Sequence, residues 1–167
     1  MRSVLLRVWC CVLITGCLGT WTPAARGLDP EGWALSVGSF DVSNEGRFEG
    51  GLEYRLRPFR LKTVEFTPAA GIAATEDGSV WIYGGLRWDM ELSEHWILTP
   101  HLALALYEEG DGKDLGGPAE FRTGLELALR FAQGSRIGLN FCHISNARIY
   151  EHNPGSNSLI LTWSLGR

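Results

Sequence analysis

The chain has few cysteines, no excess of positive charge and no long apolar run beyond its N-terminal region. Only Cys142 of the four cysteines lies after residue 25, so an internal disulfide is excluded from the rest of the chain. Lys and Arg number 15 against 19 Asp and Glu, which argues against a nucleic-acid partner. Helical membrane spans are not expected where long apolar runs are missing. The 167 residues suffice for one domain with a sizeable core.

The N-terminal region has the pattern of a secretory signal peptide. Basic residues at positions 2 and 7 accompany an apolar stretch over residues 8–18, and the small residues Ala24 and Ala25 follow. We therefore expect a signal peptide over residues 1–25 and one domain over residues 26–167. Removal of residues 1–25 would take away Arg2 and Arg7, so the net charge of the remaining chain would be two units more negative.

A lipid anchor is the alternative for this region. Ile14-Thr15-Gly16-Cys17 resembles a bacterial lipobox, which would be acylated at Cys17. The choice between signal peptidase cleavage and lipidation at Cys17 stays open at the level of sequence.

The rest of the chain divides into strand-like runs bounded by turn residues such as Asn44, Pro58, Gly78 and Gly134. Eight runs are expected, over residues 33–42, 47–57, 64–74, 80–92, 96–107, 119–131, 136–145 and 157–165. Short connections between successive strands are typical of an up-and-down meander. Runs of about ten residues match a tilted, bilayer-spanning β-strand better than the usual strand of a soluble sheet.

Alternation within these runs separates an apolar face from a charged one. In residues 119–131, Phe121, Leu125 and Leu127 share one face, while Glu120, Arg122 and Glu126 share the other. Both charge signs on one face suit an ion-paired barrel interior, with the apolar face toward lipid. A soluble antiparallel sandwich would also alternate, so periodicity alone leaves that alternative open.

Aromatic residues recur near the ends of the expected strands, as in the interfacial girdles of membrane barrels. They are Trp33, Trp81, Tyr83, Trp96, Tyr107 and Trp163. Together with strand length and mixed charge, they lead us to predict an all-β fold: an eight-stranded antiparallel up-and-down transmembrane β-barrel of the outer-membrane type.

The run His143-Ile144-Ser145 carries the best candidate for chemistry. Residues i and i+2 of a strand point to the same side, so an imidazole and a hydroxyl would be neighbours there. Histidine is suited to accept the proton of a serine nucleophile, which needs such a base. Taken alone, the pattern His-x-Ser is also what a rim histidine and a turn serine would give.

Three further residues complete the candidate site. Asn157 has the parity to lie on the same face, and its side-chain carbonyl would orient His143 as in Cys-His-Asn hydrolases. Asn146 and the backbone amides after Ser145, beginning with Ala147, would supply an oxyanion hole. Cys142, which would face the other way, is expected to be a buried packing residue rather than a catalytic thiol.

A family resemblance joins these residues. Phe141-Cys142-His143-Ile144-Ser145-Asn146-Ala147, then Asn153-Pro154-Gly155-x-Asn157 and a terminal hydrophobic strand, resemble the PagL-type lipid A 3-O-deacylases, also called the acyloxyacyl hydrolase family, and Glu120-Phe121-Arg122-x-Gly124-x-Glu126-Leu127 is also similar. The firm resemblance covers roughly the last third of the chain.

The resemblance implies that Ser145 is the nucleophile, that His143 is the general base, and that Asn146 with nearby amides binds the oxyanion. The implied reaction is hydrolysis of the 3-O-linked acyl ester of lipid A by a serine esterase in the Gram-negative outer membrane. Two departures stand out. Some family members carry Glu at the position of Asn157, so Glu151 is an alternative partner for the histidine, and the chain ends in Leu165-Gly166-Arg167 without a terminal aromatic residue.

The expected partners are lipid A within lipopolysaccharide and the lipids of the outer membrane. No cofactor is needed for this reaction, and the scattered histidines 95, 101, 143 and 152 suggest no metal site. A catalytically silent barrel with a structural or adhesive role is the main alternative, and a soluble periplasmic barrel that binds an apolar ligand is a weaker one. The oligomeric state is left open, a homodimer included.

Overall fold

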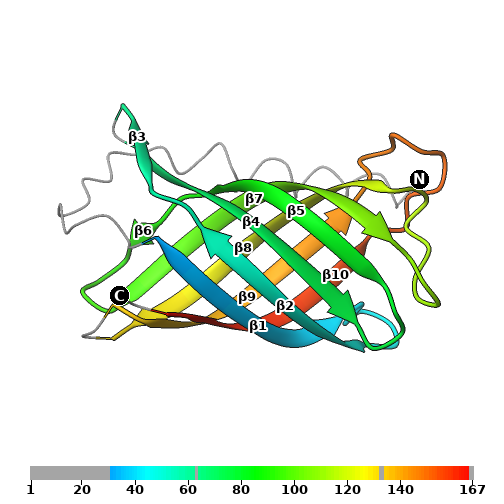
Figure 1. Cartoon of the computed structure of the whole chain (residues 1–167), viewed down its shortest axis with the longest axis horizontal. Helices are drawn as coiled ribbons and strands as arrows, with labels where there is room; N and C mark the ends of the chain where they lie inside the picture. Colours follow the sequence, from blue (N-terminus) through cyan, green and yellow to red (C-terminus); the bar gives the residue numbers. More distant parts are fainter. Residues whose placement is uncertain (1–30, 63, 132–133, 166–167) are drawn as a thin grey trace, which may run out of the picture.

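The computed structural model describes residues 31–62, 64–131 and 134–165 (Figure 1). The expected signal peptide over residues 1–25, its boundary with the domain and the alternative lipidation site at Cys17 all lie outside the described residues. The domain itself is built almost entirely from antiparallel strands.

Eight long strands form the wall of a barrel. They are β1 (Gly32–Phe40), β2 (Arg47–Arg55), β4 (Val64–Thr75), β5 (Val80–Arg87), β7 (Trp96–Glu108), β8 (Ala119–Arg130), β9 (Arg136–Ser145) and β10 (Ser156–Ser164). Two short strands, β3 (Phe59–Leu61) and β6 (Met90–Glu91), pair with the adjoining ends of β4 and β7. Each long strand follows one of the expected runs.

The barrel is closed because the first and last strands pair. Each long strand pairs antiparallel with the next, and β1 also pairs with β10, with Val37 opposite Leu161. Closure removes the exposed edges that an open sheet would offer. The predicted fold, an eight-stranded antiparallel up-and-down barrel of the outer-membrane type, is therefore confirmed. No helix among residues 31–62, 64–131 and 134–165 has the length and hydropathy of a membrane span.

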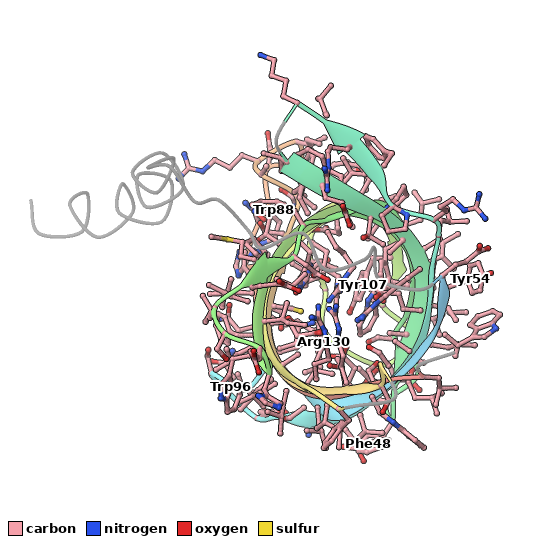
Figure 2. All side chains as sticks on the ribbon, turned by 90° about the vertical axis from the view of Figure 1, so that its left-hand side faces the viewer. Phe48, Tyr54, Trp88, Trp96, Tyr107 and Arg130 are labelled. Carbon is pink, nitrogen blue, oxygen red and sulfur yellow. The ribbon has the colours of Figure 1, made fainter. Side chains whose placement is uncertain are left out.

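The two faces of the wall follow the alternation in the sequence. Glu120, Arg122 and Glu126 of β8 are buried inside the barrel, whereas Leu125 and Leu127 lie on its exposed outer face. Seen along the barrel axis, Phe48, Tyr54 and Trp96 project outward and Tyr107 and Arg130 point inward (Figure 2). An exposed apolar belt around a charged interior is the reverse of a soluble protein and is what a bilayer requires.

Charged side chains from three strands bridge the interior. Arg87 of β5 binds Glu126 of β8 at 2.9 Å and Glu53 of β2 at 3.3 Å. Arg55 of β2 binds the same two carboxylates, at 3.0 Å to Glu53 and 3.6 Å to Glu126. All four groups are buried, so each charge has a partner in place of water. These residues form the ion-paired interior that the mixed-charge faces predict.

The aromatic girdle is smaller than predicted, because three of its six members point into the barrel. Trp81 and Tyr107 are buried, and Tyr83 is half-buried with its hydroxyl donating to Glu53 at 3.2 Å. Their positions in β5 and β7 have the inward parity, and they pack with Phe40 and with one another. The exposed members at the end of the barrel where β1 begins and β10 ends are Trp33, Trp96 and Trp163.

Several strand boundaries also differ from the predicted runs, and two of these differences add a short strand. The run over residues 80–92 is interrupted at residues 88–89, which separate β5 from β6. β2 ends at Arg55, before Pro58 as expected, and Phe59–Leu61 then folds back on β4 as the short strand β3. Cys142 is buried on the inner face, as expected of a packing residue, with its Sγ 3.8 Å from Nε2 of His101.

Candidate active site

The candidate site lies at the end of the barrel opposite the end where β1 begins and β10 finishes. It is built from the last residues of β9, the first residues of β10 and the β1–β2 turn over residues 41–46 (Figure 1). His143 and Asn157 are directly opposed in the β9–β10 ladder, so the register of the two strands brings them together.

Asn157 holds the imidazole of His143. Nδ1 of His143 lies 2.8 Å from Oδ1 of Asn157. A carbonyl oxygen only accepts, so this contact places the ring proton on Nδ1 and leaves the lone pair of Nε2 free to accept a proton. The predicted pair is thus brought together in the geometry that a general base needs.

Ser145 shares the outer face of β9 with His143, two residues along the strand. Its side chain is half-buried, and its strand neighbour in β8 is Phe121. Among the described residues, no hydrogen bond joins the Ser145 hydroxyl to the imidazole. Catalytic hydrogen bonds are often long before substrate binds, so the shared face is the relevant geometric feature.

Ser43, which the sequence analysis did not identify, extends the hydrogen-bonded series from His143 through Asn157. Nδ2 of Asn157 donates to Oγ of Ser43 at 3.0 Å. The turn that carries Ser43 is attached to the same residue, because the amide of Val42 donates to the main-chain carbonyl of Asn157 at 3.0 Å. Both ends of the Asn157 amide are therefore engaged, with the oxygen toward His143 and the nitrogen toward Ser43.

Gly155 gives the imidazole its space. A Cβ at this position would lie 3.0 Å from Cε1 and 3.3 Å from Nε2 of His143, and 3.2 Å from the carbonyl oxygen of Ile144. The residue also has a φ of +61°, which glycine adopts without strain. Glycine at residue 155 therefore suits the left-handed backbone, and a larger residue there would have to displace the imidazole of His143 slightly.

Asn146 is turned into the protein rather than toward the outer face. It is fully buried, and its Nδ2 donates to the carbonyls of Leu115 and His152, both at 2.8 Å. Its Oδ1 accepts the amide of Arg148 at 2.9 Å, and its own amide donates to Oδ1 of Asn153 at 3.1 Å. Because all these donors are engaged, Asn146 has none left for an oxyanion, which revises the direct contact expected of it.

The two residues after Asn146 have a left-handed backbone. Ala147 has a φ of +51° and Arg148 of +67°, which is uncommon for residues other than glycine. Such conformations cost energy and concentrate at functional sites, where the surroundings enforce them. Here the bonds made by Asn146 hold the turn. Within the described chain the Ala147 amide has no hydrogen-bond acceptor, so it is a free donor two residues after Ser145.

The site interrupts the apolar belt near its rim. His143 is flanked across the sheet by the exposed Thr123 of β8 and by Asn157. One step toward the middle of the barrel, the neighbouring outer row is formed by Leu125, Phe141 and Leu159, all about half-exposed. An apolar chain lying on that row would bring its polar end to His143 and Ser145.

Glu151, the alternative partner of the histidine, lies in the β9–β10 loop. It is exposed and lines a hollow with Arg148, Ile149, Tyr150 and Asn153. In the described part of the chain, no hydrogen bond or ion pair joins it to His143. The same residues contain no group of histidine, cysteine and carboxylate side chains that could hold a metal ion.

Asp41 connects the β1–β2 turn to the β7–β8 loop and to the start of β10. Its Oδ1 accepts from Nζ of Lys113 at 2.7 Å and from Oγ of Ser156 at 3.2 Å, and Asn44 donates to the same carboxylate. Burial alone would raise the pKa of Asp41, but the bonds from Lys113, Asn44 and Ser156 outweigh it and lower the pKa. The charged carboxylate therefore fixes the β1–β2 turn beside the start of β10.

Comparisons with known proteins identify the family and the fold of the chain. The sequence profile of the family described as Lipid A 3-O-deacylase (PagL) matches residues 62–166. A crystal structure of the outer membrane enzyme PagL superposes with a TM-score of 0.63 at 18% identity, covering 81% of this chain and 99% of that one. A de novo designed transmembrane β-barrel superposes with a TM-score of 0.52 at 8% identity, covering 81% of this chain and 97% of that one.

These structural likenesses support the fold alone, since both identities are low. No curated protein matches the chain. The family profile extends over more than half of the sequence and includes the site residues of β9, β10 and the loop between them, whereas the β1–β2 turn with Ser43 lies outside it. The chain therefore belongs to the PagL family of lipid A 3-O-deacylases, which are hydrolases.

Proposed function

We propose that this barrel is an outer-membrane serine esterase that removes the 3-O-linked acyl chain of lipid A. The observation that carries the proposal is the His143–Asn157 hydrogen bond on the outer face of β9 and β10, with Ser145 on the same face. The substrate is inferred from membership of the deacylase family, and the mechanism is inferred from the arrangement of His143, Ser145 and Asn157.

In the proposed first step, Ser145 attacks the ester carbonyl. Nε2 of His143 takes the hydroxyl proton while Oγ forms the new C–O bond, and the carbonyl oxygen becomes an oxyanion. Asn157 keeps the Nδ1 proton in place and stabilises the imidazolium through its carbonyl oxygen. The amide of Ala147 donates to the oxyanion, and Asn146 contributes indirectly by fixing the turn that aims this amide.

Collapse of the tetrahedral intermediate breaks the bond to the 3-hydroxyl oxygen of the sugar, which takes the proton from Nε2 of His143. Water then attacks the acyl carbon of the acyl-enzyme while Nε2 of His143 accepts its proton. The bond from this carbon to Oγ of Ser145 breaks, Oγ takes the proton back from His143, and the fatty acid leaves. No cofactor takes part in either step.

The position of the site suits a substrate that stays in the membrane. The longer loops, over residues 109–118 and 146–155, lie at the site end of the barrel, and longer loops of outer-membrane barrels are extracellular. Lipid A would thus meet the site from the outer leaflet. Its acyl chain would lie along Leu125, Phe141 and Leu159, and its ester would reach Ser145 from the lipid side.

The test is mass spectrometry of lipid A from a Gram-negative host that produces the chain. The wild type should remove one hydroxyacyl group, and Ser145→Ala and His143→Ala should leave lipid A intact. Heat-modifiable migration on a gel would show that each variant is folded. Intact lipid A with the folded wild type would instead support the catalytically silent barrel, for which the neutral Asn157 is the best argument.

A further inference from the structure

The end of the barrel opposite the site carries a hairpin that leaves the wall. β3 pairs with the start of β4, so that Phe59 faces Phe66 and Leu61 faces Val64. Viewed along the barrel axis, this hairpin stands out sideways beyond the ring of strands (Figure 2), and in Figure 1 its tip lies beside the end of the barrel rather than past it. The longer loops of this barrel lie at the site end, so the hairpin lies at the end that is periplasmic in outer-membrane barrels. Turns at the periplasmic end are usually short, so a projecting hairpin there is unusual.

One face of the hairpin is apolar and exposed. Leu61 is 62% exposed and Phe59 is 45% exposed, although both are large hydrophobic residues. Phe59 stacks on Phe66 at a centroid distance of 5.9 Å, and Phe66 meets Trp88 at 6.2 Å. The aromatic contacts hold the hairpin in shape but leave its outward face uncovered.

This face continues the lipid-facing belt of the barrel. Val64 and Phe66 have the same parity in β4 as Ala70 and the exposed Ile72, which lie on the outer surface of the wall. Phe59 and Leu61 extend the row across the hairpin through their pairing with β4. The uncovered patch is therefore continuous with a surface whose partner is the hydrocarbon of the membrane.

The hairpin is basic within an acidic chain. Arg57, Arg60 and Lys62 lie on it or at its base and are exposed, while the chain as a whole has a net charge of −4. Arg60 is paired with Glu65 at 3.2 Å. Arg57 and Lys62 have no acidic partner among the described residues. Cations beside an apolar face are typical of segments that lie at the surface of an anionic bilayer.

We propose that this hairpin is a membrane-surface anchor, which rests on the periplasmic leaflet beside the barrel. Phe59, Leu61, Val64 and Phe66 contact the acyl chains, while Arg57 and Lys62 contact the phosphates of anionic phospholipids. The anchor fixes the depth and tilt of the barrel at the end away from the site.

A second copy of the chain fits this surface less well. A stable protein interface takes about 20–30 residues from each partner, and the hairpin offers only a few. In a two-fold contact the same patch would face itself, so the cations Arg57 and Lys62 of both copies would be brought together.

The experiment uses the full chain with all four cysteines changed to Ser, so that Leu61→Cys supplies a single thiol, and this thiol carries a fluorescent label. The labelled protein is folded into phosphatidylcholine vesicles with and without phosphatidylglycerol. Quenching is measured with a nitroxide attached to the lipid and with iodide in the water. His95→Cys, exposed in the β6–β7 turn at the same end, is the aqueous control, and Leu139→Cys in the belt is the lipid control.

We expect the Leu61 label to behave like the Leu139 label, with strong lipid-nitroxide quenching and several-fold weaker iodide quenching than at His95. Phosphatidylglycerol should increase the protection from iodide, and Arg57→Gln with Lys62→Gln should abolish that increase. Phe59→Cys provides a second position if labelling at residue 61 disturbs folding.

Iodide quenching at residue 61 equal to that at His95 would overturn the proposal. So would protection from both quenchers together with disulfide cross-linking between chains of the unlabelled Leu61→Cys protein, because a second copy would then cover the hairpin.

Discussion

Nδ1 of His143 and Oδ1 of Asn157 are 2.8 Å apart across the β9–β10 ladder, and this contact orients the candidate base. The partner is an amide, so it fixes the ring without contributing a negative charge. A carboxylate in the same place would hold the ring as well and would also stabilise the imidazolium that forms during the reaction.

Asn157→Asp is therefore expected to raise kcat, and Asn157→Leu to lower it by about 10- to 100-fold, the range of a hydrogen bond to a charged group. The measurement is the rate of fatty-acid release from purified lipopolysaccharide by the folded barrel in detergent. Equal rates for the wild type and the Leu variant would show that Asn157 does not act on His143, and Glu151→Gln would then be the next variant to measure.

Ser43 should act through Asn157. Ser43→Ala removes the acceptor of Nδ2 and is expected to lower kcat by about 2- to 10-fold, with KM unchanged, because a neutral hydrogen bond contributes about 0.5–1.5 kcal/mol. In Ser43→Asp the carboxylate can only accept a hydrogen bond. It should therefore keep Nδ2 of Asn157 directed toward residue 43, and the variant should retain the activity. In the Asn157→Leu background, Ser43→Ala should lower kcat no further. If it lowered kcat as much there as in the wild type, Ser43 would not act through Asn157.

The interior ion network should control stability rather than chemistry. Glu126→Leu leaves Arg87 and Arg55 with one carboxylate fewer in a buried setting, which should lower the free energy of unfolding by about 3–5 kcal/mol. Adding Arg87→Met removes the unpaired charge, so the double variant should regain most of the loss. Urea unfolding of the refolded barrel measures both, and a double variant less stable than Glu126→Leu would refute this account.

Asp41 should make the rim sensitive to acid. Its pKa is lowered in the folded chain, so the folded state binds the proton less readily than the unfolded state. Its contribution to stability is therefore complete above the ordinary aspartate pKa of 3.8 and is lost as the pH falls through the lowered value. The melting temperatures of the wild type and Asp41→Asn should differ at pH 6 and converge toward pH 3. A difference that is constant with pH would contradict the role of the charge.

The wall of the barrel could be predicted because each strand carries its own alternation. The interior positions of Glu120, Arg122 and Glu126 follow from parity alone, as does the opposite orientation of Cys142 and His143. The same parity places Trp81 on the face of Arg87, inside the barrel, so the girdle was overestimated because aromatic residues near strand ends were counted without regard to the face they occupy.

The site was predictable only where its residues lie on neighbouring strands. His143 and Asn157 share one ladder, but Ser43 reaches Asn157 from a turn 114 residues away in the sequence. The inward orientation of Asn146 depends on the carbonyl of Leu115, which belongs to another loop. Neither contact has a local pattern that reveals it, because each depends on how the loops meet after the barrel has closed.

The most direct test of the central claim compares the lipid A of cells that produce the wild type or Ser145→Ala, with both proteins folded in the outer membrane. The account predicts that a single hydroxyacyl group is lost from lipid A with the wild type and that none is lost with the variant. Equal loss with both proteins would contradict Ser145 as the nucleophile, and no loss with either would contradict the proposed deacylase activity of this chain.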